Sequence, residues 1–138
     1  MLYPKKVKYR KWQTGRTNLK RTRVETRGAK LAFGSHGLKA SAHGRITAQQ
    51  LEAARKTMSR SIKKVGKIWV RVFPDRPFTQ KPAEVKMGKG KGDIAGYCVE
   101  VNPGRILFEI DGIPPSEARD ALRKAGSKVS VKTIVIER

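Results

Sequence analysis

"GRITAQQLEAARKTMSRSIKKVGKIWVRVF", residues 44–73, places a helical pattern directly before a strand pattern. Thr47, followed three residues later by Gln50, is the signature of a capping box, which begins a helix. Five apolar residues then recur at helical spacing: Leu51, Ala54, Met58, Ile62 and Val65. Because these residues fall on an arc of about 80° and Gly66 follows them, the pattern predicts an amphipathic helix that stops at Gly66.

The strand pattern that follows has two different faces. In "KIWVRVF", residues 67–73, aliphatic residues alternate with rings and cations. The aliphatic set is Ile68, Val70 and Val72, and the other set is Lys67, Trp69, Arg71 and Phe73. This alternation predicts a strand with one aliphatic face and one face of rings and cations. Three prolines come next and predict an extended connection: Pro74, Pro77 and Pro82.

The remaining third of the chain reads as strands and a second helix. "GYCVEV", residues 96–101, and "RILFEI", residues 105–110, flank the turn signal at residues 102–104, and we expect a β-hairpin there. A helix should follow Pro114 and Pro115, because acidic residues lie near its start and basic residues near its end. Its inward side is expected to be Ala118, Ala121, Leu122 and Ala125. Gly126 should end it, and "VKTIVIE", residues 131–137, predicts a last strand.

These elements predict an α+β fold, a mostly antiparallel sheet with two helices packed on one face, plus a Gly/Lys-rich loop. A length of 138 residues suits one domain, which we expect over residues 31–138. Residues 1–30 hold too few aliphatic residues for a core and are expected to form a basic, extended N-terminal arm. The arm interleaves three rings with its cations: Tyr3, Tyr9 and Trp12. Such rings can stack on unpaired bases or pack on the protein itself, and the sequence leaves both open.

Charge gives the strongest indication of function. The chain carries 32 Lys and Arg against 11 Asp and Glu, a formal net charge of +21. Residues 1–92 hold 25 of the cations and four of the acids, whereas residues 93–138 hold seven of each. So large an excess on one small domain predicts a polyanionic partner, and nucleic acid is the default one. The outward side of the predicted first helix carries five cations and a single acid, Glu52. A helix surface that is merely solvated usually mixes both signs, so this imbalance favours a surface that faces RNA.

The stretch "KMGKGKGDIAG", residues 86–96, tests whether the chain binds a nucleotide. A P-loop needs Ser or Thr after its lysine and a helix after the loop, and neither pattern is present. The glycines also alternate instead of following the dinucleotide-binding spacing, and the residues after them read as a strand. A loop whose backbone lies against sugar and phosphate is the favoured interpretation, and a flexible hairpin tip with solvated lysines is the alternative.

Other kinds of chemistry find little support. Cys98 is the single cysteine, which excludes an internal disulfide and is typical of a small buried residue in a strand. His36 and His43 lack partnering ligands, so we expect no metal site and no cofactor. No catalytic motif is recognisable, and we expect the chain not to be an enzyme. The start of the chain lacks an apolar signal core, and we expect mature sequence with no membrane association.

Three rival functions remain to be separated by experiment. A DNA-compacting protein would share the basic charge and would prefer duplex DNA to rRNA in competition. A membrane-active protein would need bulky apolar residues on a cationic helix, where this chain has small ones and Met. A nucleotide-dependent enzyme would have to bind ATP or GTP.

Five segments resemble, in order, the family of large-ribosomal-subunit protein sixteen in its bacterial and organellar form. The segments are "MLYPKKVKYRK", "FGSHGLKA", "GRITAQQLEAAR", "GKIWVRVFPDRPFTQKPAEVKMGKGKG" and "PGRILFEIDGIP". The resemblance covers nearly the whole chain. It implies an α+β sandwich that binds large-subunit rRNA, contributes to the A-site tRNA region near the peptidyl-transferase centre and joins the subunit late in assembly. The implied partners are large-subunit rRNA, A-site tRNA and neighbouring ribosomal proteins, in bacterial cytoplasm or an organelle, without a homo-oligomer.

From the charge pattern and the resemblance together we expect contacts to rRNA or tRNA from one set of residues. In the arm they are Lys5, Lys6, Lys8, Arg10, Lys11, Trp12 and Arg16; in the body, Arg45, Arg55, Lys56, Arg60, Lys63 and Lys64; in the loop, Lys86, Met87, Gly88, Lys89, Gly90, Lys91 and Gly92. The chain departs from the family pattern in three places: Lys86 stands where bacterial members usually carry arginine, Gly96 and Tyr97 stand where tyrosine and tryptophan are common, and residues 14–30 differ from the usual shorter linker. No function is transferred to that last stretch.

Overall fold

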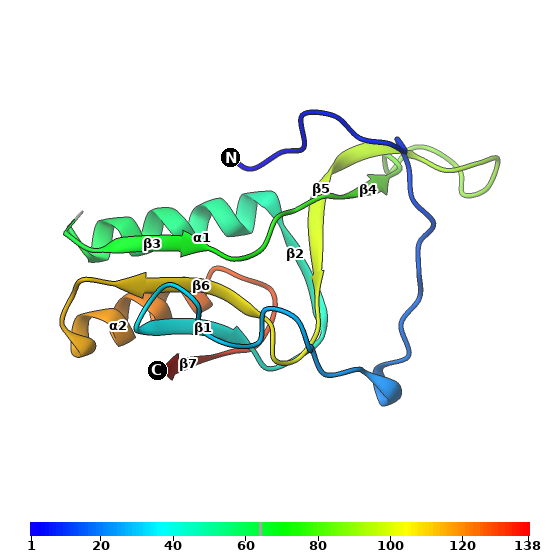
Figure 1. The fold of residues 1–138 in the computed structure, drawn as a ribbon. Helices are drawn as coiled ribbons and strands as arrows, with labels where there is room; N and C mark the ends of the chain where they lie inside the picture. The colour runs from blue at the N-terminus through cyan, green and yellow to red at the C-terminus, as the bar shows by residue number, and fades with distance from the viewer. Residues whose placement is uncertain (64) are drawn as a thin grey trace.

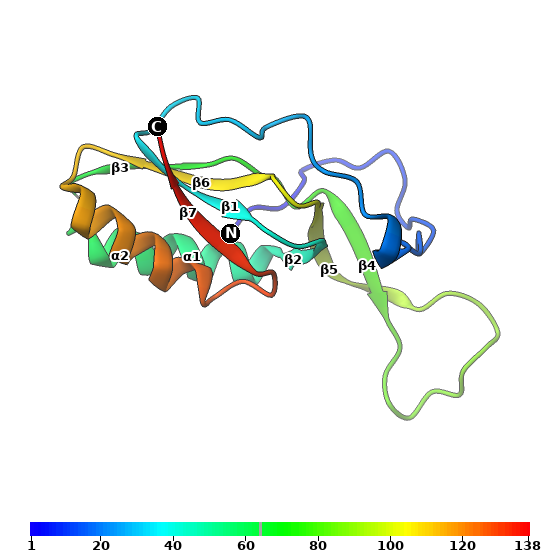
Figure 2. The same cartoon turned by 90° about the horizontal axis from the view of Figure 1, so that it is seen from below.

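The structure, a computed structural model, describes residues 1–63 and 65–138. The strands are β1 (His36–Ala40), β2 (Gly44–Thr47), β3 (Lys67–Val70), β4 (Arg76–Gln80), β5 (Asp93–Val101), β6 (Ile106–Asp111) and β7 (Thr133–Glu137); the helices are the 3-10 turn η1 (Leu19–Arg21), α1 (Ala48–Ser61) and α2 (Pro115–Gly126). The strands form two antiparallel sheets with the orders β3-β6-β1-β7 and β2-β5-β4. Both helices cover the same face of the four-stranded sheet, and the three-stranded sheet extends away from it (Figures 1 and 2). The predicted α+β class is confirmed, with the strands divided between two sheets.

Helix α1 begins at the predicted capping box. The Thr47 hydroxyl accepts a hydrogen bond from Gln50 N at 3.2 Å, and the Gln50 side chain accepts one from Thr47 N at 3.1 Å. Four apolar residues of the predicted stripe are buried: Leu51, Ala54, Met58 and Ile62. Val65 was expected in the same stripe but is 77% exposed. The helix ends at Ser61, and Lys63 adopts a left-handed backbone conformation, so the helical spacing no longer applies at Val65.

Helix α2 matches its prediction closely. It runs from Pro115 to Gly126, and the four residues expected to face inward are all buried. Three of these four residues are alanines, whose small side chains let the helix lie close to α1 and to the sheet. The core between helices and sheet is filled by larger residues: Leu38, Leu51, Met58, Leu107, Phe108, Ile110 and Leu122. At about 25 cal/mol for each Å² of apolar surface removed from water, this layer is the main source of stability.

The predicted hairpin of β5 and β6 is wrong. Strand β5 pairs with β2 and β4 in the three-stranded sheet, whereas β6 pairs with β1 and β3 in the four-stranded sheet. The turn between them exists, since Arg105 N donates to Asn102 O at 3.2 Å and Gly104 has a φ of 100°. It carries the chain from one sheet to the other. Because both edges of β6 are taken by strands distant in sequence, the turn signal alone could not show which strands pair.

The proline-rich stretch was expected to be an extended connection and instead contains strand β4. Pro77 lies within this strand and pairs in register with Tyr97 of β5. Strand β4 is at the edge of its sheet, where a residue without an N–H is tolerated. The expectation was wrong because an edge strand needs hydrogen bonds on one side only.

Cys98 lies on β5 with its side chain buried, as expected, and burial raises the pKa of its thiol. Within the described residues, no helix is both long enough and apolar enough to cross a membrane.

Candidate nucleic-acid interface

The Gly/Lys-rich loop, residues 81–92, connects strand β4 to strand β5 and projects from the end of the molecule (Figure 2). A strand therefore follows the loop, whereas a nucleotide-binding P-loop is followed by a helix whose N-terminus binds the phosphate. Gly88 and Gly90 have φ values of 97° and 104°, a region that favours glycine. A Cβ at either position would have nothing within 4 Å. Glycine is required there by backbone conformation, and it leaves the backbone of the loop open to a partner.

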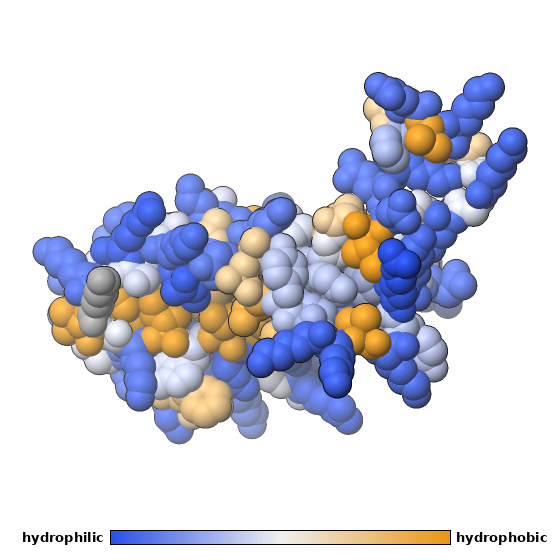
Figure 3. All heavy atoms as spheres, turned by 90° about the horizontal axis from the view of Figure 1, so that it is seen from above, coloured by the Kyte–Doolittle hydropathy of each residue, from blue (hydrophilic) through white to orange (hydrophobic). Residues whose placement is uncertain are grey.

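Cations cover this loop. Lys86, Lys89 and Lys91 are exposed, and no ion pair involves them among the described residues. Met87 at the loop is 89% exposed, and Figure 3 shows the loop as a projection with mostly hydrophilic side chains around a few apolar ones. Lys81 donates a hydrogen bond to Gly88 O, which closes the base of the loop upon itself. The resulting surface offers separate positive charges on an accessible backbone.

The N-terminal arm exposes its first cations and packs two of its three rings. Lys5, Lys6, Lys8 and Arg10 are exposed, as is Arg16 further along. Two of the rings contact the body: the Tyr3 ring lies 5.9 Å from the Tyr97 ring in an edge-on arrangement, and the Trp12 ring lies 5.5 Å from the guanidinium of Arg76. Tyr9 is 61% exposed beside Lys8. Of the two interpretations left open for the rings, packing on the protein describes Tyr3 and Trp12 in this structure.

Three residues hold the arm on the three-stranded sheet, and we call Arg45, Arg76 and Glu100 the arm clamp. The Arg76 guanidinium donates hydrogen bonds to the carbonyl oxygens of Gln13 and Thr14, each at 2.7 Å. Arg45 also donates to Thr14 O at 2.7 Å. Glu100 lies between the two arginines, 2.8 Å from Arg45 Nη2 and 3.3 Å from Arg76 Nη1. Arg45, expected to contact RNA, thus makes an ion pair and a hydrogen bond within the protein, although its side chain is 39% exposed.

Ion pairs also engage part of the expected surface on helix α1. Arg55 binds Glu52 through two hydrogen bonds of 2.7 and 3.1 Å, and Lys56 lies 3.8 Å from the same carboxylate. The hydrogen bond from Arg55 is the main reason that the pKa of Glu52 is lowered. Arg60 and Lys63 are exposed. Lys64, which completes the expected set, lies outside the described residues.

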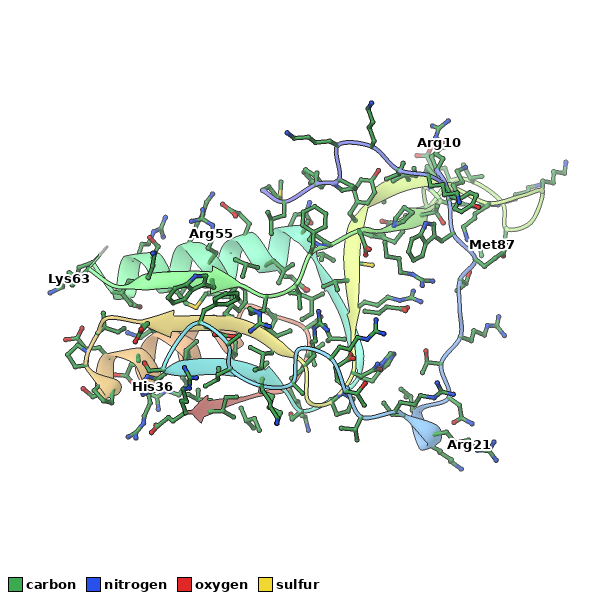
Figure 4. The ribbon with its side chains drawn as sticks, in the orientation of Figure 1. Arg10, Arg21, His36, Arg55, Lys63 and Met87 are labelled. Atoms are coloured by element: carbon green, nitrogen blue, oxygen red, sulfur yellow. The ribbon has the colours of Figure 1, made fainter. Side chains whose placement is uncertain are left out.

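The expected site residues form two groups instead of one surface. Figure 4 shows Arg10 and Met87 at one end of the long axis and Lys63 at the other, with Arg55 on α1 between them. Arm and loop are joined by a contact between Lys11 Nζ and Asp93 Oδ1 at 3.6 Å. The structure therefore places Arg10 and the loop at one end and Lys63 at the other. The arm itself begins beside α1 (Figure 1), where the N-terminal ammonium contributes to the lowered pKa of Glu52.

Neither histidine serves a metal site in the described part of the chain. His36 is buried and its Nδ1 lies 2.9 Å from Ser35 Oγ, while His43 Nδ1 lies 3.0 Å from Asn102 Oδ1. No group of three or more His, Cys, Asp or Glu among residues 1–63 and 65–138 is arranged to hold a metal ion.

Sequence reasoning missed a buried carboxylate, Glu109 on β6. Its side chain accepts hydrogen bonds from Gly34 N and Phe33 N at 2.7 Å and from Ala32 N at 3.2 Å, and Arg71 completes the set. Burial raises the pKa of Glu109, but the three N–H groups and the Arg71 guanidinium outweigh it, so the pKa is lowered. A single acid inside the apolar run "RILFEI" was the available signal, because a buried charge must be paired.

A family model and similar proteins match this chain over nearly its whole length. The family model described as ribosomal protein L16p/L10e matches residues 4–136. Similar proteins named large ribosomal subunit protein uL16 occur in Xanthomonas oryzae pv. oryzae (strain PXO99A), Xanthomonas euvesicatoria pv. vesicatoria (strain 85-10) and Xanthomonas campestris pv. campestris (strain B100). Each is 50% identical over 138 residues, covering 100% of this chain and 98% of the relative. The chain therefore belongs to the ribosomal protein L16p/L10e family.

Proposed function

We propose that this chain binds large-subunit rRNA and contributes to the A-site tRNA-binding region near the peptidyl-transferase centre. The family consists of structural proteins of the ribosome and not of enzymes, and the relatives named above are constituents of the large subunit in bacteria. The observation that carries the proposal is the projecting loop, where Lys86, Lys89 and Lys91 are exposed. This chain would act within the ribosome in the bacterial cytoplasm, beside other large-subunit proteins.

The chemistry of binding follows from the arrangement of charge. Lysines that make no internal ion pair can neutralise phosphates and release their counterions, which supplies affinity with little sequence discrimination. The glycines between them let the loop backbone approach a sugar-phosphate surface closely. The exposed cations of the arm, Lys5 to Arg10, lie on a segment that runs from beside α1 toward the loop end, where Arg10 lies, so arm and loop can engage one folded RNA together (Figures 1 and 4). A protein with such contacts supports the folding of rRNA late in subunit assembly.

Salt dependence tests the general proposal. Each phosphate contact adds about 0.7 to 0.9 to the slope of log affinity against log salt concentration. We therefore expect binding to protein-free large-subunit rRNA to weaken by orders of magnitude between about 50 and 200 mM salt. Duplex DNA as competitor should displace the protein less well than rRNA does. Affinity that is flat over this range, or a preference for duplex DNA, would contradict the proposal.

The loop is tested by removing two of its cations. The double variant Lys89→Ala/Lys91→Ala should fold normally, show a salt slope smaller by about 1.5, and impair subunit assembly or A-site tRNA binding. Sucrose-gradient sedimentation and tRNA binding to purified ribosomes measure these effects. The matched control is Lys124→Ala/Lys128→Ala, which removes the same charge at the exposed C-terminal end of α2. Normal polysomes and normal tRNA affinity in the loop variant would remove the proposed role of the loop.

A further inference from the structure

The face of the four-stranded sheet opposite the helices carries a stack of two rings, of which Phe33 is exposed and Trp69 is half-buried. Trp69 on β3 pairs in register with Glu109. Phe33 belongs to the segment that crosses this face before β1 (Figures 1 and 2), and its ring stacks on Trp69. The ring centroids of Phe33 and Trp69 are 6.0 Å apart and their planes differ by 17°. Two cations adjoin the stack: Lys67 Nζ lies 5.9 Å from the Trp69 centroid, and Arg71 Cζ lies 5.1 Å from the Phe33 centroid. We call Phe33 and Trp69 the ring pair.

Phe33 is held in place by its backbone. Its own N–H and those of its two neighbours donate to the buried Glu109 carboxylate. A Cβ at Gly34 would lie 2.6 Å from Ile110 O, so the chain passes β6 too closely for any other residue. Burying a carboxylate is costly unless it is fully paired, and here the pairing fixes the segment that presents Phe33. The ring pair is therefore preorganised before any partner arrives.

The ring pair does not serve as core. Phe33 is 56% exposed although it is stacked on Trp69, whereas Phe108 on the helix-covered side is completely buried. The exposed Phe33 ring, stacked on Trp69 and flanked by Lys67 and Arg71, fits a planar aromatic group that carries a negative charge, which describes a nucleotide. A peptide partner would favour an apolar surface without cations at its centre.

We propose that the ring pair is a stacking site for an unpaired rRNA base, with Lys67 placed to meet the phosphate of that nucleotide. This rests on the proposed function, since it adds a base contact to phosphate contacts made elsewhere. The site lies apart from the loop and the arm, so the protein would bind rRNA on the outer sheet face as well. Trp69 and Lys67 thereby gain a role beyond packing, whereas Arg71 of the same stretch is paired with Glu109.

Tryptophan fluorescence tests the site directly. The chain has two tryptophans, so Trp12→Phe leaves Trp69 as the single reporter. Titration with protein-free large-subunit rRNA should quench Trp69 in step with binding. Oligoadenylate should quench it more than oligouridylate of equal length, because the two carry the same phosphates and the purine stacks better. Phe33→Leu should weaken rRNA binding about tenfold, and Phe33→Tyr should restore it.

Controls separate this inference from the proposed function. Ile134→Ala removes an exposed apolar residue from strand β7 at the other edge of the same sheet and should leave affinity unchanged. If rRNA binds with unaltered Trp69 fluorescence and Phe33→Leu has no effect, base stacking is refuted while the proposed function stands. If the unmodified chain binds no rRNA, the proposed function fails. If Phe33→Leu lowers incorporation into subunits without lowering rRNA affinity, a neighbouring protein occupies the site and the inference is overturned.

Discussion

The N-terminal segment, residues 1–34, and the loop, residues 81–92, look alike in sequence and differ in how they are held. Both are basic and contain glycine, and neither contains a strand or an α-helix. One network centred on Glu100 with its two arginines and one centred on Glu109 hold the segment, and Arg105 adds a hydrogen bond to the Arg27 carbonyl between them. The loop, in contrast, makes few contacts with the body.

The kind of cation explains this difference. The cations that hold the segment are arginines, Arg45, Arg76 and Arg71, whose planar guanidinium groups donate to carboxylates, the first two also to carbonyl oxygens. The cations of the loop are lysines, which are strongly hydrated point charges and remain available to phosphates. A positive charge in the sequence is thus not automatically a positive charge offered to RNA.

The largest effect on stability is expected at Glu109, which holds the N-terminal segment against strand β6. Glu109→Gln should lower the free energy of unfolding by about 3 to 5 kcal/mol, because it leaves Arg71 without its charged partner in a largely buried position. Urea denaturation at pH 7 measures this change. Glu84→Gln in the loop is the matched control and should leave stability unchanged. Equal stability of the two variants would erase the proposed difference between segment and loop.

The pH dependence of stability tests whether the ionised form of Glu109 holds the segment. The pKa of Glu109 is lower in the folded chain than in the unfolded chain, where it is about 4.3. The ionised carboxylate therefore stabilises the fold fully above the unfolded pKa. This contribution is lost as the pH falls through the folded pKa. The difference in stability between the unmodified chain and Glu109→Gln should therefore be full at neutral pH and shrink on acidification below that value. Denaturation curves at a series of pH values check this. A difference that stays constant to the lowest pH would contradict the assignment.

Arg76→Ala should have a smaller effect that is confined to the arm. The variant loses hydrogen bonds to the Gln13 and Thr14 carbonyls and the contact with Trp12, at a cost of about 1.5 to 3 kcal/mol for hydrogen bonds of a charged group. Limited proteolysis should show faster cleavage within residues 1–16 while α1 stays protected. Arg76→Lys should not restore protection, because lysine lacks the planar fork. An unaltered rate of cleavage in the arm would show that the clamp does not hold it.

The smallest effect is expected from glycine in the loop. Gly88→Ala is strained locally by its φ of 97°, but the loop lies apart from the core, so the unfolding midpoint should hardly move. Gly34→Ala is the matched change in the segment and should be clearly destabilising, because its Cβ would lie 2.6 Å from Ile110 O. Thermal unfolding of both variants compares them. Similar losses would mean that the loop is as tightly integrated as the segment.

Features written in short stretches of sequence were predictable. The capping box at Thr47, the inward side of α2 and the buried strand position of Cys98 each depend on neighbours a few residues away, and each is confirmed. The uneven distribution of charge likewise required only counting. Local spacing failed at Val65, because the helix ended one turn earlier than the apolar pattern.

Other features depend on residues far apart and became visible only in the tertiary structure. The hairpin signal at residues 102–104 is real as a turn, yet β6 pairs with strands that lie 35 or more residues earlier in the chain. Arg45 and Arg55 were both expected to face RNA, and both form ion pairs within the protein. Arg55 pairs with Glu52, three residues earlier on the same helix, whereas Arg45 on β2 pairs with Glu100 on the neighbouring strand β5. The sequence does not show which groups Arg76 and Glu109 bind, since their partners lie between 24 and 77 residues away in the chain.

The sequence by itself determined that this is a basic α+β protein with an arm, a lysine loop and a polyanionic partner, because periodicity, capping and net charge are properties of short stretches or of simple sums. Only the tertiary structure decided which strands share a sheet, which cations bind carboxylates and carbonyl oxygens of the protein itself, and which rings stay exposed. Those outcomes depend on which distant groups meet when the core closes, and a charge or ring has no fixed role until its neighbours are set.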